Sequence, residues 1–499
     1  MKSLSCGLLL SMFLASGAGA APPLSSGPRL ALAPCRLPGL EREARCGTYE
    51  VFEDRTARSG RKIGLRVVVI PAGPAGQHPA AADPVVYFEG GPGGSAVDSG
   101  PGLLEEFPAA LRDRDLVLVD ARGTGGSSPL LCPAQQGLRQ IEEALDTFMS
   151  PAAARRCREA LSRGHDLTQY TTDAIVDDVD EVRDALGYGK VNLLGASYGT
   201  RAALVYLRRH PEAVRSALLI SVVPQDARVP RLLAPHTQAA FERMAADCTA
   251  EPACRQAFPD PKADLKAVLD RLAASPAEVT VDDEEGRERT MRLSRDGAAQ
   301  TVRYLLYSPA RAREVPAVLR RAAAGDLQPL AQRAHDLATF FLASPPDGLY
   351  LSVTCAEDVA FVDPEEARRQ AAGTFMGDFR LLQQIAACAE WPAARLPSGF
   401  LDPVRSTAPV LILAGENDPA TPLAWAEQVA ASLAGSRILV IPGGAHSFTG
   451  LEGIECTDRV AADFLARGGA EGAEKVDLES CRRAIRRAPF LLTLDDRKP

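Results

Sequence analysis

The sequence predicts an α/β fold in which a mostly parallel sheet is interrupted by a large, mainly helical insertion. Short apolar runs recur along the chain without alternating polar residues, which is typical of strands covered on both faces. In both end portions of the chain these runs alternate with helical patterns, whereas residues 225–404 are Ala/Arg-rich and mainly helical. At 499 residues, the chain also exceeds the size at which one core usually stops growing.

Eight strands are expected, of which the weakest is an edge strand at Tyr49–Phe52. The other seven are the runs Leu65–Ile70, Val85–Phe88, Leu116–Val119, Val191–Leu194, Ala217–Ile220, Val410–Leu413 and Ile438–Ile441. The helical spacing of apolar residues predicts helices over Thr171–Leu186, Ser197–His210, Ala298–Tyr307 and Ala310–Ala324. Inside the insertion, a charged turn between two short runs suggests a hairpin of Val279–Val281 with Met291–Leu293.

The chain begins with a segment that has the features of a secretory signal peptide. Lys2 precedes the short apolar stretch Leu8–Ala15, and the small residues Ala18–Ala20 resemble a cleavage site. We therefore expect a signal peptide over residues 1–20 and a secreted or periplasmic protein. The core domain would comprise residues 21–224 and 405–499, with residues 225–404 inserted as a helical cap.

Cysteine usage agrees with an exported protein. Of the 11 cysteines, Cys6 lies in the expected signal peptide, which leaves an even number in the mature chain. Disulfides between close neighbours in an oxidising compartment are the simplest hypothesis, although free buried thiols are an alternative. The neighbours are Cys35 and Cys46, Cys132 and Cys157, Cys248 and Cys254, Cys355 and Cys388, and Cys456 and Cys481.

Composition and charge argue against several classes of partner. The formal net charge is −8 and no basic stripe is present, so we expect no nucleic-acid partner. After the N-terminal segment no apolar run is long and uncharged enough for a membrane span, so no stable membrane insertion is expected. The cysteines form no CxxC pairs and have no histidine cluster beside them, so no metal and no cofactor is implied.

Residues 195–199 read GASYG, which matches the GxSxG motif. The motif lies between an expected strand and an expected helix, which is the context of a nucleophile elbow. A sharp turn of this kind exposes the serine at the end of the strand, and the helix N-terminus favours developing negative charge. Ser197 is therefore the expected nucleophile.

A serine hydroxyl needs a base to take its proton, and the sequence contains six histidines. His446 lies in the glycine-rich loop after the last strand, where a base can reach the elbow. A carboxylate that orients the imidazole is expected after the preceding strand. Asp418 is our choice for it, with Glu416 in the same loop as the competitor. The order Ser197, Asp418, His446 is that of α/β-hydrolases.

Residues 88–95 read FEGGPGGS, and half of them are glycine. The run lacks the signatures of a phosphate-binding loop and instead follows the strand after which this fold supplies an oxyanion-hole amide. We expect the N–H groups of Gly91 and Tyr198 to be the two donors. A second glycine-rich turn, Asp120–Ser127, either lines the site or is a structural turn held by Asp120 and Arg122.

These motifs together resemble the proline iminopeptidase and tripeptidyl aminopeptidase branch of the α/β-hydrolases. The matching pieces are GGPGGS, DARGTGGSS, GASYGT, LILAGENDPATP and GGAHS, in that order. The secreted tripeptidyl-aminopeptidase-like members also resemble the chain at Thr171–Gly187, at Cys355–Glu357 and in the tail with Cys456 and Cys481. The resemblance implies an eight-stranded α/β-hydrolase core with a large helical cap.

The resemblance further implies a serine exopeptidase that releases residues from the free N-terminus of short peptides. Such an enzyme needs an anion for the substrate ammonium, and we expect Glu357 in this role, with Glu89 as the alternative. Proline iminopeptidases have a histidine where this chain has Glu89, which affects loop hydrogen bonding and substrate preference. The alternatives are a carboxylesterase of the same fold and a catalytically silent binding protein.

Overall fold

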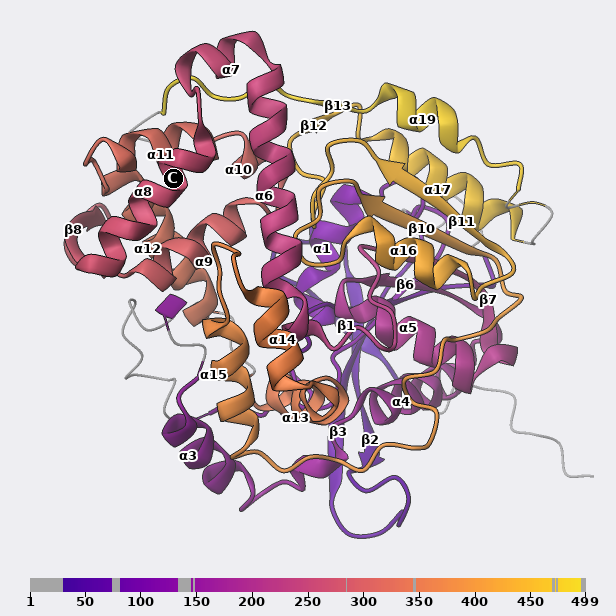
Figure 1. Ribbon diagram of the computed structural model, residues 1–499. Coiled ribbons are helices and arrows are strands. Elements are labelled where there is room, and N and C mark those ends of the chain that lie inside the picture. Colours follow the sequence, from indigo (N-terminus) through magenta and orange to yellow (C-terminus); the bar gives the residue numbers. More distant parts are fainter. Residues whose placement is uncertain are drawn as a thin grey trace, which may run out of the picture.

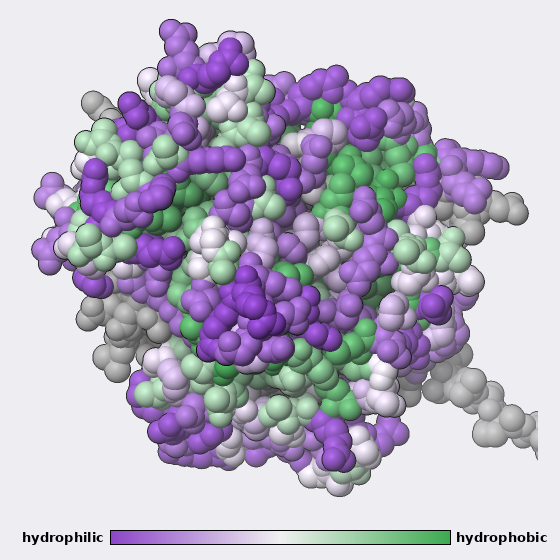
Figure 2. All heavy atoms as spheres, viewed as in Figure 1, coloured by the Kyte–Doolittle hydropathy of each residue, from purple (hydrophilic) through white to green (hydrophobic). Residues whose placement is uncertain are grey.

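The computed structural model describes residues 30–73, 81–132, 145–146, 149–283, 285–343, 347–468, 472 and 474–494. The expected signal peptide over residues 1–20 lies outside the described residues. None of the helices in these ranges combines the length and the hydropathy that a membrane crossing requires. On the face seen in Figure 2, hydrophilic side chains cover most of the surface and leave scattered apolar patches between them.

The core of the molecule is one nine-stranded sheet in the order β1-β2-β3-β5-β4-β6-β7-β10-β11. The six strands from β5 to β11 in this order pair in parallel, and β1, β2 and β3 extend the sheet antiparallel. The strands are β1 Ala33–Cys35, β2 Ala44–Phe52, β3 Lys62–Ile70, β4 Val85–Phe88, β5 Leu116–Val119, β6 Val191–Ala196, β7 Val214–Ile220, β10 Val410–Gly415 and β11 Ser436–Ile441.

The fold class is confirmed, but the sheet differs from the expected eight strands at its antiparallel end. Tyr49–Phe52 is the last part of the longer strand β2, and β1 pairs only with the first residues of that strand, Ala44–Cys46. β1 has only three residues, and its middle residue is Pro34. It therefore contains no apolar run from which a strand could be predicted. Proline is tolerated there because the outer side of an edge strand needs no ladder hydrogen bond.

Both faces of the sheet are covered by helices, which explains why its strands are continuously apolar. Successive residues of one strand enter different cores, as Leu193 and Leu194 of β6 do. One face packs against α4 Thr172–Ala185, α5 Tyr198–Arg209 and α16 Leu423–Ala430. The other packs against α1 Ala96–Glu106, α17 Cys456–Arg467 and α19 Leu478–Ala484.

A helical insertion separates β7 from β10 and has a hydrophobic core of its own. Figure 1 shows its helices grouped beside the sheet. They are α6 Leu233–Ala250, α7 Pro252–Ala257, α8 Pro261–Ala274, α9 Arg295–Leu305, α10 Pro309–Ala312, α11 Val315–Ala323, α12 Gln328–Ala343, α13 Asp347–Glu357, α14 Pro364–Ala371 and α15 Phe379–Cys388. The suggested hairpin is present as β8 Ala277–Asp282 paired with β9 Glu288–Leu293.

The helix expected over Ala310–Ala324 is split into α10 and α11. Pro316 lies in the first turn of α11, where its nitrogen has no hydrogen to donate to the preceding turn. A second feature of the insertion is its contact with the core-domain helix α3 Pro151–Leu161, whose Arg155 pairs with Glu390 at 2.6 Å. The connection between β5 and β6 therefore packs on the insertion as well as on the sheet.

Five disulfides join cysteines that are close neighbours in the sequence. Three of them fix the core domain or its connections, and two lie within the insertion. The pairs are Cys35–Cys46, Cys132–Cys157, Cys248–Cys254, Cys355–Cys388 and Cys456–Cys481. A short antiparallel pair, β12 Leu451–Glu452 and β13 Arg486–Arg487, ties the C-terminal segment to the loop after β11.

Candidate active site

Ser197 occupies a sharp turn between β6 and α5. Its backbone has φ 53° and ψ −124°, a conformation that costs a non-glycine residue free energy and is typical of functional turns. The turn is anchored because the Ser197 N–H donates to the carbonyl oxygen of Ile220 in β7, at 2.9 Å. The side chain is thereby presented above the carboxyl ends of the parallel strands.

The two glycines of the GASYG motif allow this turn to form. A Cβ atom on Gly199 would lie 1.9 Å from the carbonyl oxygen of Phe88, and one on Gly195 would lie 2.6 Å from the carbonyl oxygen of Gly199. Real side chains never approach backbone so closely, so any other residue at either position would push β6, α5 and β4 apart. The motif is therefore a packing requirement of the elbow.

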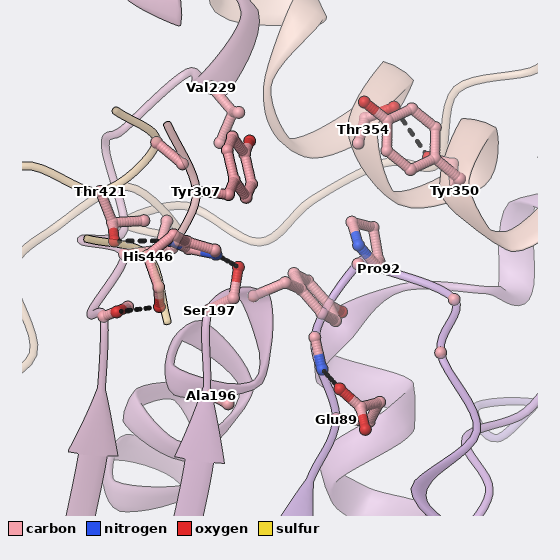
Figure 3. Close-up of a pocket in the computed structure, with 18 of the residues that line it drawn as sticks. Glu89, Pro92, Ala196, Ser197, Val229, Tyr307, Tyr350, Thr354, Thr421 and His446 are labelled. Carbon is pink, nitrogen blue, oxygen red and sulfur yellow. Dashed lines mark hydrogen bonds between the residues drawn. The ribbon is translucent and has the colours of Figure 1, made fainter. Parts of the chain in front are cut away.

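Three side chains from separate loops form a hydrogen-bonded chain at this edge of the sheet. The Ser197 Oγ lies 3.0 Å from the His446 Nε2, and the His446 Nδ1 lies 3.0 Å from the Asp418 Oδ2. Figure 3 shows the imidazole of His446 between the serine and the residues after β10. The structure thus brings together the three residues expected to form a triad, although 249 positions separate Ser197 from His446.

Asp418 is held as an acceptor by its own loop. Its carboxylate is fully buried and accepts the N–H groups of Ala420 and Thr421, at 2.7 and 2.9 Å, and the Thr421 hydroxyl at 2.6 Å. Burial by itself raises the pKa of this carboxyl, but the charge of His446 and the hydrogen bonds from His446 and Thr421 bring the pKa below its usual value. Asp418 therefore stays ionised and fixes the imidazole with Nδ1–H facing it.

Glu416, the competitor for this position, does not approach the imidazole. It is exposed, and its carboxylate accepts the N–H of Gly443 at 3.0 Å. The glutamate thus braces the base of the loop that carries His446, whereas Asp418 contacts the ring. Of the two acids in this loop, Asp418 is therefore the one that bonds to the imidazole.

The glycine-rich loop after β4 lies directly against Ser197. A Cβ atom on Gly90 would be 3.3 Å from the Ser197 Cβ. Within the described part of the chain, Gly90 N–H donates to Glu89 and Gly94 N–H to the Gly90 carbonyl, while no acceptor is recorded for Gly91 N–H. The Tyr198 N–H has no intrahelical acceptor because Tyr198 is the first residue of α5. Both amides expected to hold the oxyanion are thus available as donors.

The second glycine-rich turn is mainly structural. Asp120 accepts the Ser95 hydroxyl at 2.8 Å and the Gly126 N–H at 2.9 Å, so it links this turn to the start of α1. Arg122 is fully buried and makes a bidentate contact with Asp178, at 2.7 and 2.8 Å. Of this turn, Gly125 alone reaches the cavity described next. The turn therefore stabilises the neighbouring loop that carries Gly91.

A cavity of about 900 Å³ opens above Ser197, between the carboxyl ends of the strands and the helical insertion. A stripe at helical spacing on and just after α9 forms part of its wall, consisting of Gln300, Arg303, Tyr304 and Tyr307. Tyr307 stands over His446 in Figure 3, with 5.0 Å between the ring centroids. This contact cannot be predicted from the sequence, because nothing in a helical stripe indicates which distant loop it meets.

Glu357, expected to bind the substrate ammonium, does not line the cavity, and this expectation is corrected. Its carboxylate is fully buried behind Tyr198 and accepts the N–H and the hydroxyl of Thr172, at 2.7 and 2.6 Å. The same hydroxyl lies 2.7 Å from the Tyr198 hydroxyl. Burial raises the pKa of Glu357 to about 7, although Arg201 and Thr172 lower it. Glu357 thus supports the residue after the nucleophile.

Glu89 lines the cavity, but its carboxylate is occupied by its own loop. It accepts the N–H of Gly90 at 2.5 Å and the hydroxyl of Ser99. In Figure 3 the side chain lies beneath the loop that carries Pro92, away from Ser197. Glu89 therefore holds the glycine-rich loop in place, a role that a histidine would fill with different hydrogen bonds.

Among the described carboxylates of the insertion, Asp358 is the one that lines the cavity, in place of its neighbour Glu357. It is buried and forms a bidentate pair with Arg201, at 2.9 and 3.1 Å, and accepts the Val229 N–H at 3.1 Å. Adjacent acidic residues at the end of a helix point in different directions. Only the register of α13 determines which one faces the cavity.

Comparisons with known proteins agree with this geometry. A family model described as alpha/beta hydrolase fold matches residues 83–450, more than half of the chain. This chain belongs to the α/β-hydrolase fold family. The hydrolase is 26% identical over 488 residues to serine protease Hip1 of Mycobacterium tuberculosis, covering 87% of this chain and 88% of the relative.

Two further relatives differ in their named activities. Tripeptidyl aminopeptidase of Streptomyces coelicolor is 27% identical over 470 residues, covering 87% of this chain and 83% of the relative. Carboxylesterase B of Mycobacterium tuberculosis is 28% identical over 459 residues, covering 86% and 85%. The resemblance to the tripeptidyl aminopeptidase branch is thus confirmed, and the protein is a serine hydrolase.

Proposed function

We propose that this hydrolase is a secreted serine exopeptidase that cleaves short peptides from their free N-terminus through an acyl-enzyme. The observation that carries the proposal is the hydrogen-bonded chain of Ser197, His446 and Asp418 at the floor of a covered cavity. The relatives named serine protease and tripeptidyl aminopeptidase support peptides as the substrates.

In the proposed reaction, the Ser197 Oγ attacks the scissile carbonyl carbon while the His446 Nε2 takes its proton. Asp418 stabilises the imidazolium that forms. The N–H groups of Gly91 and Tyr198 donate to the oxyanion, and each such donor typically contributes about 3 kcal/mol of transition-state stabilisation. His446 then returns the proton to the leaving amine, and water, activated by the same imidazole, hydrolyses the acyl-enzyme.

The helical insertion supports exopeptidase action. We take residues 225–404 as a cap whose stripe on α9 forms part of the cavity wall above the serine, and we expect this cap to limit access to short peptides. For the substrate ammonium we propose Asp358 in place of Glu357. Its carboxylate lines the cavity. The Oδ1 atom accepts two hydrogen bonds, whereas the Oδ2 atom accepts only one, from Arg201, and can therefore accept another from the substrate ammonium.

Export is supported by the disulfides. Five of them in one chain are typical of an oxidising compartment such as the periplasm or the extracellular medium. We propose that the N-terminal residues 1–20 direct the chain there and are removed.

The test is a panel of fluorogenic amides of proline, alanine and short alanine peptides, each with a free and an acetylated N-terminus. We expect hydrolysis of free-amine substrates, slower by about a hundredfold after acetylation, and none with Ser197→Ala. The exposed Ser162→Ala is the matched control and should match the wild type. Asp358→Asn should reduce the ratio between free and acetylated substrates, whereas Glu357→Gln should leave it unchanged. Equal rates for both substrate forms would exclude recognition of the N-terminus.

A carboxylesterase is the second candidate, because one relative carries that name and an acyl-enzyme serves esters equally well. Turnover of short-chain acyl esters with no hydrolysis of any peptide amide would establish the esterase instead. A protein that hydrolyses neither and is not labelled by a serine-directed phosphonate would be a binding protein.

A further inference from the structure

Arg303 is a buried cation of the cavity wall without a carboxylate partner in the part of the chain that the structure describes. Only 6% of the residue is exposed, and no carboxylate of the described residues lies within ion-pair distance of its guanidinium. The guanidinium instead lies over the rings of Tyr304 and Tyr307, at 4.7 and 4.9 Å, and donates to the Tyr307 hydroxyl. Its Nε–H is buried without an acceptor.

A buried charge without a counter-ion costs free energy, and aromatic rings and a hydroxyl compensate only part of that cost, so such a charge at a cavity is suited to bind an anionic ligand group. Gln300, one turn earlier on α9, repeats the pattern, because its buried Oε1 also lacks a donor in the described structure. Both residues line the cavity. Arg303 and Gln300 thus lie on one helical face, and each has a buried polar atom that the described residues leave unpaired.

None of the described charged groups of the cavity wall is a counter-ion for Arg303. Among the described residues of the insertion, Arg303, Arg380 and Asp358 are the charged residues that line the cavity. Asp358 forms its bidentate pair with Arg201 and not with Arg303. The other acids of the wall belong to the opposite side of the cavity, where Glu89 is bonded to its own loop and Asp98 is an exposed residue near Arg66.

Arg303 lies close enough to the triad to contact a short substrate bound there. The guanidinium carbon is 4.9 Å from the centre of the Tyr307 ring, which is 5.0 Å from the centre of the His446 ring. The guanidinium is therefore at most about 10 Å from the imidazole, a span of about three extended residues.

We propose that Arg303 and Gln300 form a subsite for a substrate carboxylate, so that this hydrolase selects peptides with a carboxylate within about three residues of the scissile bond. A guanidinium suits this role because its planar N–H groups match the two oxygens of a carboxylate. The subsite deepens the proposed exopeptidase function and uses the same cavity. The carboxylate is either the C-terminus of a short peptide or an acidic side chain.

The experiment measures binding to the inactive Ser197→Ala protein by isothermal titration calorimetry, so that it does not depend on turnover. One arm compares alanine peptides of two to four residues as free acids and as C-terminal amides. The other arm compares C-amidated peptides with Glu or Gln at each position. We expect the acid of at least one arm to bind about ten- to a hundredfold more tightly than its matched amide.

Arg303→Met in the Ser197→Ala background should remove this preference while the amides bind as before. The matched control is Arg311→Gln, which removes an exposed arginine from the same insertion and should keep the preference. Circular dichroism and thermal unfolding establish that each variant is folded. Should Arg303→Met fail to fold, the comparison of acids with amides on Ser197→Ala still shows whether the cavity prefers a carboxylate.

Three outcomes would each overturn the subsite. The first is equal binding of acids and amides in both arms, and the second is no detectable binding of any peptide up to millimolar concentration. The third is a preference for acids that persists in folded Arg303→Met protein. These outcomes are distinct from failure of the proposed function. A carboxylate preference in binding without peptide hydrolysis by the wild type contradicts the exopeptidase alone, whereas hydrolysis without the preference contradicts the subsite alone.

Discussion

The Tyr307 ring stands edge-on to the His446 ring, with 5.0 Å between their centroids and 64° between their planes. Next to this contact, the Ser447 N–H donates to the Tyr307 carbonyl oxygen at 2.8 Å. The helical insertion therefore touches the candidate base by a side chain and its loop by a backbone bond. The orientation of the imidazole thus depends on two domains.

Replacing Tyr307 by alanine should lower kcat, because the imidazole loses the ring that confines it. Aromatic pairs contribute about 0.5–1.5 kcal/mol, so we expect a decrease of up to about tenfold. Tyr307→Phe keeps the ring and is the matched control, with kcat close to that of the wild type. The measurement uses a small acetyl ester that does not extend to Arg303. An unchanged kcat in Tyr307→Ala would show that the contact has no part in orienting His446.

Asp418→Asn should lower kcat by about 10⁴ with little change in stability, because the amide favours the wrong imidazole tautomer. Glu416→Gln is the control from the same loop, and we expect its kcat to stay within about twofold of the wild type, since Glu416 contacts Gly443 and not the ring. Steady-state kinetics with one ester and one peptide amide measure both. A comparable loss in the two variants would contradict the assignment of Asp418.

Glu357 should make stability depend on pH in the neutral range. Its pKa rises from an ordinary value of 4.5 to about 7 because it is buried, so the folded protein prefers the protonated form. The stability contributed by this proton is fully present below about pH 4.5 and is lost as the pH rises through about 7. The free energy of unfolding should change by an amount on the order of 3 kcal/mol over this range.

Glu357→Gln lacks this titration, so its free energy of unfolding relative to the wild type should increase between pH 5 and pH 8. Urea denaturation of both proteins at several pH values measures the difference. Because all other groups are shared, their titration cancels in the comparison. A difference that is independent of pH would mean that Glu357 is ionised in the folded protein throughout this range.

Gly199→Ala should disrupt the elbow, because the added Cβ would lie 1.9 Å from the Phe88 carbonyl oxygen. We expect a loss of about 3 kcal/mol or more of stability together with loss of activity. Gly189→Ala is the matched control, since a Cβ there meets no atom within 4 Å. Thermal unfolding and ester hydrolysis of the two variants provide the test. If Gly199→Ala behaved like Gly189→Ala, the close packing of the elbow would be incorrect.

The elements that sequence reasoning predicted well are those with local physical causes. The apolar runs predict the parallel strands because both of their faces are covered, and the GASYG motif predicts the elbow because glycine alone fits between β4, β6 and α5. The three-residue strand β1 and the break before α11 were missed. The first lacks an apolar run, and the second arises from Pro316 inside an otherwise helical pattern.

Within the candidate site, the sequence by itself determined which residue types are present and in what order they follow the strands, since this order depends on chain connectivity. Tertiary structure decided which of two neighbouring acids faces the cavity, Asp358 rather than Glu357, and that Arg303 is buried there with none of the described carboxylates as its partner. It also brought Tyr307 against His446. These relationships depend on how the insertion docks on the sheet, and local sequence contains no information about contacts between segments that far apart.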